Sequence, residues 1–293
     1  MAKTLPSPQT VDNRQSIAPP IPKILAFIHI PKTAGTTLHR ILAHRYHPAN
    51  IRIRHDEQTN EPLTPAPNSP PPSLIMGHFS VGLHQQNPGI RYLTCLRDPV
   101  ARILSHYHHA KNDPTHYLHQ PIIARSMTPA DYVNSGLSGE LSDGMTRMLA
   151  GMDDFHRDTV DDATLQKAIH HLETLFEGII LSERFDESLL LLAERLAWPP
   201  PYYIRRKVGR YHDRTSIPDK STQAAIERHN QHDRKLYDWA MDRFRKQAEQ
   251  HPTLTQATSH FRSQNNGIGK LIVCAREIRH RLQAMSLRMT HKP

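Results

Sequence analysis

Cysteine, aromatic residues and long apolar runs are all scarce in this chain of 293 residues. The two cysteines, Cys95 and Cys274, form no CxxC pair, which argues against a zinc ribbon or a secreted disulfide scaffold. No window holds the roughly 20 apolar residues that span a bilayer. Residues 1–22 are rich in proline and lack the apolar region of a signal peptide. We therefore expect a cytoplasmic protein whose residues 1–22 form a disordered tail.

Positive charge is abundant and unevenly placed. The formal net charge is +9, and residues 199–293 hold 19 Lys and Arg against 8 Asp and Glu. Such an excess favours an anionic partner, which charge alone does not identify: nucleic acid, a phosphorylated small molecule, an acidic glycan or a lipid surface. Aromatic residues make up only 6% of the chain and offer no platform for stacking RNA bases. We therefore expect no nucleic-acid partner.

Histidine is frequent, with 22 residues, and the run HYHH at 106–109 places several imidazoles close together. A metal site needs a further group of ligands at a suitable spacing, and the sequence offers none. We therefore predict no metal site.

Proline clusters in residues 1–22, 61–72 and 199–201 divide the chain, because they exclude regular helix and central strand there. Between them, short runs rich in β-branched residues alternate with helical patterns, which predicts an α/β fold with a mostly parallel sheet flanked by helices. The expected strands cover residues 24–30, 73–79, 91–97 and 178–181, and the expected helices begin near residues 36 and 99 and cover 189–198, 221–249 and 267–289. The main domain is assigned to residues 23–250, and a basic amphipathic helical extension to residues 251–293.

The segment PKTAGTT, residues 31–37, follows the first expected strand and leads into a helix. It lacks the GxxxxGK[ST] order of a nucleotide-triphosphate loop. Its glycine, Gly35, allows a turn that brings backbone N–H groups to a helix N-terminus, where the helix dipole favours a bound anion. Lys32 adds a positive charge beside that anion. On this evidence alone, a polar turn without function remains an alternative.

A second segment, LRDPVARILSHY at residues 96–107, places Arg97 at the end of a strand and Ser105 two turns into the next helix. The carboxyl ends of parallel strands lie at one edge of a sheet, so two anion sites there can hold two phosphates of one ligand.

Together these segments resemble the sulfotransferases that use 3′-phosphoadenosine 5′-phosphosulfate (PAPS), and in particular sulfotransferase family 2, the carbohydrate branch that includes heparan 2-O-sulfotransferase-like enzymes. The resemblance continues through DGMTRMLAG (143–151), FEGIILSERFDESLLLLAERLAW (176–198) and IERHNQHDRKLYDWAMDRF (226–244). It implies a P-loop-NTPase-like three-layer fold and transfer of a sulfuryl group to a carbohydrate or other hydroxyl acceptor, with 3′-phosphoadenosine 5′-phosphate (PAP) as the product and no metal requirement. Because the chain shows no membrane anchor, a bacterial cytoplasmic relative is expected.

The resemblance also implies roles for individual residues. Lys32 would contact the oxygen that bridges phosphate and sulfate, and Arg97 and Ser105 would bind the 3′-phosphate. The residues that would hold the 5′-phosphate are Thr33, Ala34, Gly35, Thr36 and Thr37. Weaker candidates in a later basic loop are Arg210, Arg214 and Thr215. Family members often carry asparagine near Gly144, which leaves the acceptor contacts there undetermined.

The acceptor hydroxyl needs a proton acceptor, which is commonly a histidine or a carboxylate. In related 2-O-sulfotransferases a histidine after a glycine at the end of the second predicted strand has this role, and MGH places His78 there. His29 and His84 are the reserve candidates for the base, and a histidine satisfied by backbone contacts is the structural alternative.

Two other functions stay open from the sequence. A small-molecule kinase or other P-loop nucleotidase would use the same kind of sheet, and a non-enzymatic protein could bind an anionic polymer through the basic half. The helix expected at 267–289 has three open interpretations: docking on its own domain, self-association, or peripheral binding to an acidic membrane.

Overall fold

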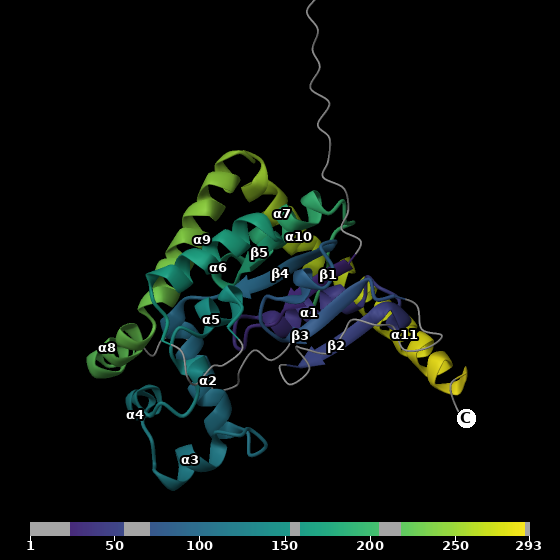
Figure 1. Cartoon of the computed structure of the whole chain (residues 1–293). Coiled ribbons are helices and arrows are strands. Elements are labelled where there is room, and N and C mark those ends of the chain that lie inside the picture. The colour runs from purple at the N-terminus through teal and green to yellow at the C-terminus, as the bar shows by residue number, and fades with distance from the viewer. Residues whose placement is uncertain (1–23, 56–70, 153–158, 205–217, 291–293) are drawn as a thin grey trace, which may run out of the picture.

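Five parallel strands form one central sheet in the computed structural model, which describes residues 24–55, 71–152, 159–204 and 218–290 (Figure 1). The strands are β1 (Ile24–Ile28), β2 (Ile51–His55), β3 (Leu74–His78), β4 (Ile90–Leu96) and β5 (Phe176–Leu181). Their order is β2-β3-β1-β4-β5, and each neighbouring pair is parallel. From β1 the chain runs to the outer strand β2, returns to β3 beside β1, and then crosses to β4 on the other side of β1. The carboxyl ends of β1 and β4 therefore flank a topological switch point, the usual ligand site of open α/β sheets.

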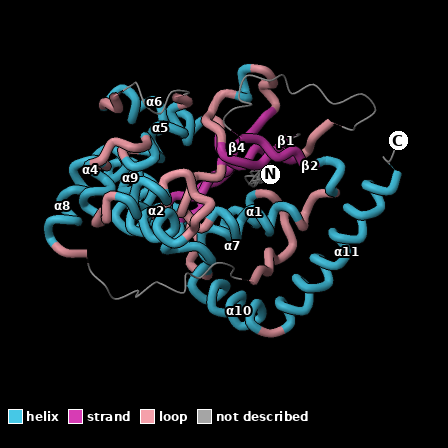
Figure 2. The backbone as a smooth tube through the Cα atoms, turned by 90° about the horizontal axis from the view of Figure 1, so that it is seen from below, coloured by secondary structure: helices cyan, strands magenta, loops and turns pink. Residues whose placement is uncertain are grey.

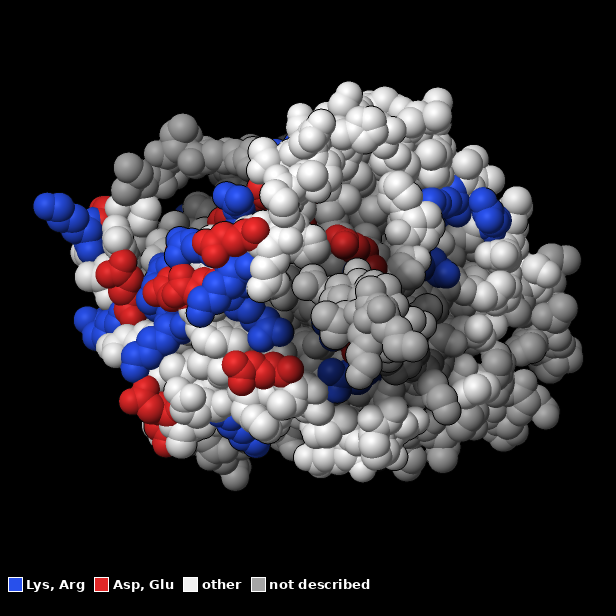
Figure 3. All heavy atoms as spheres, turned by 90° about the horizontal axis from the view of Figure 1, so that it is seen from above, with Lys and Arg blue, Asp and Glu red and all other residues white. Residues whose placement is uncertain are grey.

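Helices cover both faces of this sheet. The helices of the described residues are α1 (Gly35–Ala43), α2 (Pro99–Asn112), α3 (His119–Ala124), α4 (Pro129–Asn134), α5 (Gly144–Ala150), α6 (Asp162–Thr174), α7 (Phe185–Arg195), α8 (Lys220–His229), α9 (Gln231–Glu249), α10 (Leu254–Asn266) and α11 (Ile268–Thr290). Short 3₁₀ turns are η1 (Pro48–Asn50), η3 (Leu83–Gln85), η4 (Gly139–Leu141) and η5 (Ser182–Arg184). Figure 2 shows α10 and α11 on the outside of the molecule, beyond α1 and α7. On the face shown in Figure 3, basic and acidic side chains are interleaved within one charged area.

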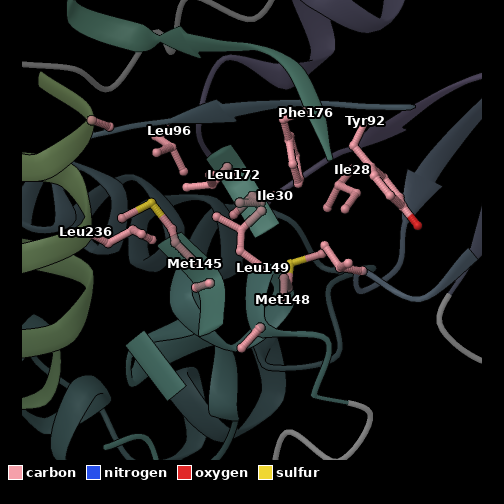
Figure 4. Close-up of a cluster of buried hydrophobic side chains, with 14 of the residues drawn as sticks. Ile28, Ile30, Tyr92, Leu96, Met145, Met148, Leu149, Leu172, Phe176 and Leu236 are labelled. Atoms are coloured by element: carbon pink, nitrogen blue, oxygen red, sulfur yellow. The ribbon is translucent and has the colours of Figure 1, made fainter. Parts of the chain in front are cut away.

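One face of the sheet packs against α5, α6 and α9. Alternate strand residues such as Ala26 and Ile28 point to this face, where they are buried. Their partners include residues from all three helices, and Figure 4 labels ten members of the cluster: Ile28, Ile30, Tyr92, Leu96, Met145, Met148, Leu149, Leu172, Phe176 and Leu236. Full burial of such a side chain contributes about 1.5–3 kcal/mol, so this cluster is a major source of stability.

The opposite face packs against α1, α7 and α10. Leu25 and Phe27 of β1 point to it, and Phe261 of α10 joins the same buried cluster. Polar contacts add to the packing, because Arg262 of α10 pairs with Asp186 of α7 at 2.6 Å. The predicted three-layer α/β architecture, with a parallel sheet between helical layers, is therefore confirmed. Helix α10 falls within the range predicted as an extension, but it contributes to this layer.

A third group of helices, α2, α3, α4 and α8, packs together beside the sheet around Ile103, Tyr132 and Ile226. Arg102 of α2 is buried and forms an ion pair of 3.3 Å with the buried Asp233 of α9. A buried charge without a partner is very unfavourable. Separation of α2 from α9 would leave both charges without a partner, so the ion pair favours the packing of these two helices.

The strands predicted from the sequence lie where the structure has β1, β3, β4 and β5, with bounds that differ by up to two residues. Strand β2 was not predicted, although IRIRH alternates apolar and basic residues. The single helix predicted at 221–249 is wrong, because the chain leaves helical geometry at Asn230 between α8 and α9. The buried Asn230 side chain donates to the carbonyls of Leu141 and Ile226, both at 3.0 Å. The tail predicted at residues 1–22 lies outside the described residues.

Candidate active site

The loop between β1 and α1 turns through two residues in left-handed conformation. Lys32 has φ 69° and Ala34 has φ 67°, whereas φ is not positive at Thr33 or Gly35. Residues that alternate in hand direct successive backbone N–H groups toward one point and form a concavity that binds anions. Ala34 caps α1 without a side-chain hydrogen bond, so the first N–H groups of α1 receive no acceptor from the capping side chain. The loop therefore has the backbone geometry of an anion site.

The three threonines of the loop have different environments. The Thr33 side chain is buried, and its Oγ1 donates to the carbonyl of Ile30 at 2.8 Å. Thr37 is also buried, whereas Thr36 is only partly buried. The Thr33 hydroxyl thus fixes the loop to the end of β1, and Thr36 is the most exposed of the three threonines.

Two histidine rings lie directly beside the loop. The His29 ring stacks on the His78 ring with centroids 4.6 Å apart and planes at 24°. Strand pairing causes this contact, because β1 and β3 are parallel neighbours in which Ile28 lies opposite Gly77. The His29 ring also lies against Gly35, where a Cβ atom would overlap its Cδ2 and Nε2. The structure therefore brings together the loop, the predicted base and one of the two reserve candidates.

A third histidine contributes to the electrostatics of this group. Burial lowers the pKa of His39 on α1, and the charges of Arg40 and His78 lower it further. A lowered pKa keeps the His39 imidazole neutral at neutral pH. His39 therefore adds no positive charge next to His78.

Arg97 connects β4 with the loop. Its Nη1 donates to the carbonyl of Lys32 at 3.1 Å. From β5, the Ser182 hydroxyl donates to the carbonyl of Thr33 at 2.7 Å. The ends of β1, β4 and β5 are thereby joined into one edge, with Lys32 and Arg97 side by side at the switch point.

Glu183 fixes the start of α2 at the same edge of the sheet. Its Oε1 accepts from the backbone N–H of Asp98 at 3.2 Å, and its Oε2 accepts from the Tyr237 hydroxyl at 2.7 Å. Asp98 in turn caps α2 by accepting from the N–H of Ala101 at 2.9 Å, and it pairs with Arg234 of α9 at 2.7 Å. These contacts fix the geometry of the chain on both sides of Arg97.

The remaining predicted residues are spread more widely. Ser105 lies on α2, mostly buried, two turns beyond Arg97. His84 lies elsewhere, because its Nδ1 is 3.2 Å from the Tyr92 hydroxyl and its ring packs against His171. The predicted residues Arg210, Arg214 and Thr215 lie outside the described residues.

Several residues that organise the edge were missed by the sequence reasoning. Ser182 and Glu183 follow β5 in the run SERF, and a polar run after a buried strand could have indicated them. Gly77 has φ 154°, and a Cβ atom there would overlap the carbonyl oxygen of Arg54. The glycine in MGH therefore permits the close approach of β2 to β3.

The first histidine of HYHH belongs to a separate polar group. His106 contacts Glu140 Oε2 and the Tyr132 hydroxyl, each at 2.8 Å. Burial opposes ionisation of Glu140, but the contacts with His106 and Tyr117 outweigh it and lower its pKa to about 2. Within the part of the chain that the structure describes, no three His, Cys, Asp or Glu side chains are grouped so that they could hold a metal ion.

Comparison with known proteins identifies the family. The family model described as galactose-3-O-sulfotransferase matches residues 83–280, which is more than half of the chain. The chain belongs to the galactose-3-O-sulfotransferase family. The matched range includes Arg97 and Ser105 and begins after the β1–α1 loop and His78.

The curated relatives carry the same description. The chain is 29% identical to galactose-3-O-sulfotransferase 3 of Bos taurus over 202 residues, which cover 62% of this chain and 47% of the relative. It is 28% identical to the Homo sapiens protein over the same length. The chain thus spans about half the length of the curated relatives it matches. A mouse sulfotransferase, SULT7A1, complexed with PAP has 15% identity and a TM-score of 0.38, and the match covers 71% of this chain and 63% of that chain.

These findings correct two predictions. The predicted cytoplasmic location is wrong, because the relatives are animal galactose-3-O-sulfotransferases, which are enzymes of the Golgi type. The assignment to a bacterial member of the heparan 2-O-sulfotransferase-like branch is not supported, because the matched family is the galactose-3-O branch.

Among the described residues, none of the helices combines the length and the apolar character that a membrane span requires.

Proposed function

We propose that the protein transfers the sulfuryl group of PAPS to a hydroxyl of a galactose-containing carbohydrate. The hydrogen bond between Arg97 and the Lys32 carbonyl carries the proposal, because it joins the two segments that we assign to anion binding at the switch point of the sheet. PAPS carries phosphate groups at the 3′ and 5′ positions of its ribose, and two adjoining anion sites fit such a ligand. Family membership and the relatives named galactose-3-O-sulfotransferase support the acceptor class, with the 3-hydroxyl of galactose as the first choice.

In this proposal the β1–α1 loop holds the 5′-phosphate through the backbone N–H groups of residues 33–37 and the Thr36 hydroxyl. Arg97 and Ser105 hold the 3′-phosphate. Lys32 lies beside the oxygen that bridges phosphate and sulfate and stabilises the negative charge that develops there. Arg210, Arg214 and Thr215 stay weaker candidates for nucleotide contacts.

The transfer is an in-line displacement at sulfur. The acceptor oxygen forms a bond to sulfur while the bond from sulfur to the bridging oxygen breaks, and the electron pair stays on that oxygen next to Lys32. His78 takes the proton of the acceptor hydroxyl. The stacked His29 ring holds the His78 ring in place, and His29 itself is the alternative base. No step draws on a metal ion.

The donor is tested by thermal shift of the protein with PAP, with ATP and Mg²⁺, and with a short RNA. We expect PAP without metal to raise the melting temperature most, because binding to the folded state alone stabilises it. A larger response to ATP and Mg²⁺ would favour a kinase or nucleotidase, and a larger response to RNA would favour a polymer-binding protein.

The anion grip is tested by the variants Lys32→Ala and Arg97→Ala. Each should weaken PAP binding by about 10- to 100-fold, because a hydrogen bond to a charged group contributes about 1.5–3 kcal/mol. Lys246→Ala is the matched control, since it removes one positive charge from an exposed position on α9. Unchanged PAP affinity in both site variants would reject the assignment.

The base is tested by His78→Ala, His29→Ala and His84→Ala, with PAP affinity and turnover measured separately. We expect His78→Ala to keep PAP binding and to lose about 100-fold or more in turnover with a galactoside acceptor. His84→Ala, away from the loop, should keep turnover. Full turnover in His78→Ala together with loss of turnover in His29→Ala would identify His29 as the base.

A further inference from the structure

Helix α11 carries a stripe of exposed apolar side chains. Its members are 59–72% exposed, and they are Ile268, Leu271, Ile278, Leu282 and Met285. Their spacing of three, seven, four and three residues places them along one side of the helix. Only three further large apolar side chains among the described residues are exposed: Ile53, Tyr117 and Ile123. The outer side of α11 is therefore the main apolar surface that the described part of the chain leaves uncovered.

The side of α11 that packs on the domain is a different one. Val273 is buried there, and Glu277 forms an ion pair of 3.2 Å with Arg40 of α1. The His280 ring lies against the ring of His44, with centroids 5.9 Å apart. Figure 2 shows α11 along the outer edge of the molecule. The apolar stripe therefore faces away from the domain, so intramolecular docking of α11 leaves the stripe uncovered.

Basic residues border the stripe on both sides. At 100° per residue, Lys270 and Arg281 lie along one border and Arg276 and Arg279 along the other. Glu277 is the one carboxylate in the described part of α11, and it lies on the docked side. The interleaved charges shown in Figure 3 contrast with this arrangement. The stripe is thus flanked by charge of a single sign.

Two of these arginines also line a cavity between α11 and the end of α1. The cavity has a volume of about 200 Å³, and its lining residues are His44, Arg45, Tyr46, His47, Arg276, Arg279, His280 and Gln283. These residues include three arginines and three histidines but no carboxylate. Nε of Arg45 and Nε2 of His280 are buried without a hydrogen-bond partner. The cavity therefore gathers cations and unsatisfied nitrogen atoms with no anion in its lining.

Burial, and to a smaller extent neighbouring cations, lower the pKa values of three side chains that line this cavity. Burial and the charge of Arg276 lower the pKa of Arg45 to about 10. Burial, the largest effect, lowers the pKa of His44, opposed by Glu277, while His280, Arg40 and Arg276 lower it further. Burial and His47 lower the pKa of His280. An anion in the cavity would offset these penalties, and a phosphate group could accept hydrogen bonds from several of the lining side chains.

We propose that α11 is a docking element for an anionic lipid membrane. The stripe lies in the boundary between headgroups and acyl chains, while Arg276, Arg279 and the cavity bind lipid phosphate groups. A second copy of the chain fits less well. If the stripes of two copies packed together, Arg279 and Arg281 of one copy would lie close to the same residues of the other copy. A two-helix seam normally has opposite charges at these positions. Membrane docking extends beyond the proposed sulfotransferase activity and does not depend on it.

The proposal is tested by co-sedimentation of the full chain with vesicles. We expect binding to phosphatidylcholine vesicles that contain about 30% phosphatidylserine, little binding to pure phosphatidylcholine, and weaker binding as the salt concentration rises. Equal binding to both vesicle types, or binding to neither, would overturn the proposal. Binding to heparin without binding to vesicles would also overturn it.

Two paired variants separate the parts of the surface. Arg276→Gln/Arg279→Gln should weaken binding to anionic vesicles roughly 25-fold, since each arginine near the surface contributes about fivefold. Leu271→Ser/Ile278→Ser should weaken it by about tenfold or more. The matched controls are Lys167→Gln/Lys246→Gln for charge and Ile123→Ser for exposed apolar surface, and both should bind like the unchanged protein.

Cys274 provides an independent readout, because it is exposed on α11 next to the stripe and Cys95 is buried. An environment-sensitive dye on Cys274 should shift its emission to the blue with anionic vesicles and stay unchanged with neutral ones. Sedimentation velocity in the absence of lipid should show a monomer. A dimer that Leu271→Ser/Ile278→Ser dissociates, combined with no dye response to vesicles, would assign the stripe to self-association instead.

Discussion

The structure explains why residue 35 is a glycine, which its place in the loop alone does not explain. The position of its missing side chain is occupied by the His29 ring, which in turn stacks on His78. The absence of a side chain at Gly35 therefore lets the strand-end histidines lie directly beside the β1–α1 loop. The same glycine also begins α1, where backbone N–H groups lack intrahelical acceptors.

At this scale we predict that Gly35→Ala is destabilising. The added methyl group overlaps His29 and forces the ring or the loop to move, which should lower the free energy of unfolding by about 1–3 kcal/mol. PAP binding should weaken as well, because the loop carries the proposed phosphate contacts. Chemical denaturation and PAP titration measure the two effects. Gly82→Ala is the control, since no atom lies within 4 Å of a Cβ atom there; an equal loss in both variants would contradict the steric explanation.

At the scale of elements, the junction of α8 and α9 is decided by tertiary contacts. The Oδ1 atom of Asn230 accepts from Arg102 Nη2 at 3.3 Å and from the N–H of Asp143 at 3.2 Å. Its Nδ2 atom donates to two carbonyls in the same buried region. The side chain thus stabilises a break in the helical geometry, although the surrounding sequence is compatible with one continuous helix.

We expect Asn230→Ala to lower the free energy of unfolding by about 2–4 kcal/mol, because it leaves several buried polar groups without partners. Urea denaturation followed by circular dichroism measures this loss. Gln231→Ala, an exposed change one residue later, should stay within about 0.5 kcal/mol of the unchanged protein. A stability of Asn230→Ala equal to that of the control would show that the helix break does not depend on this network.

At the scale of the whole molecule, the two cysteines report on different parts of the structure. Cys95 is fully buried in β4, where burial raises the pKa of its thiol, whereas Cys274 is exposed on α11. Thiol modification therefore distinguishes the sheet core from the outermost helix. Opening of a sheet core requires a large part of the free energy of global unfolding.

We predict that a thiol reagent modifies Cys274 rapidly in the folded protein and Cys95 at least about a thousandfold more slowly. The slow reaction should accelerate with urea in parallel with unfolding, as measured by absorbance of the released reagent. In Cys274→Ser only the slow reaction should remain. Two fast reactions in the folded protein would contradict the burial of Cys95.

The sequence by itself determined the parallel α/β class, because apolar strands and amphipathic helices are local patterns whose period follows from backbone geometry. It also marked Lys32, Gly35 and Arg97 as candidates, since they lie at or shortly after the ends of predicted strands, and the family resemblance added His78. Only the tertiary structure showed that His29 and His78 stack and that Arg97 reaches the Lys32 carbonyl. These contacts join residues far apart in the chain, and they depend on strand order and side-chain packing, which local patterns do not contain. For the same reason, the break at Asn230 and the basic cavity beside α11 became visible only in the folded molecule.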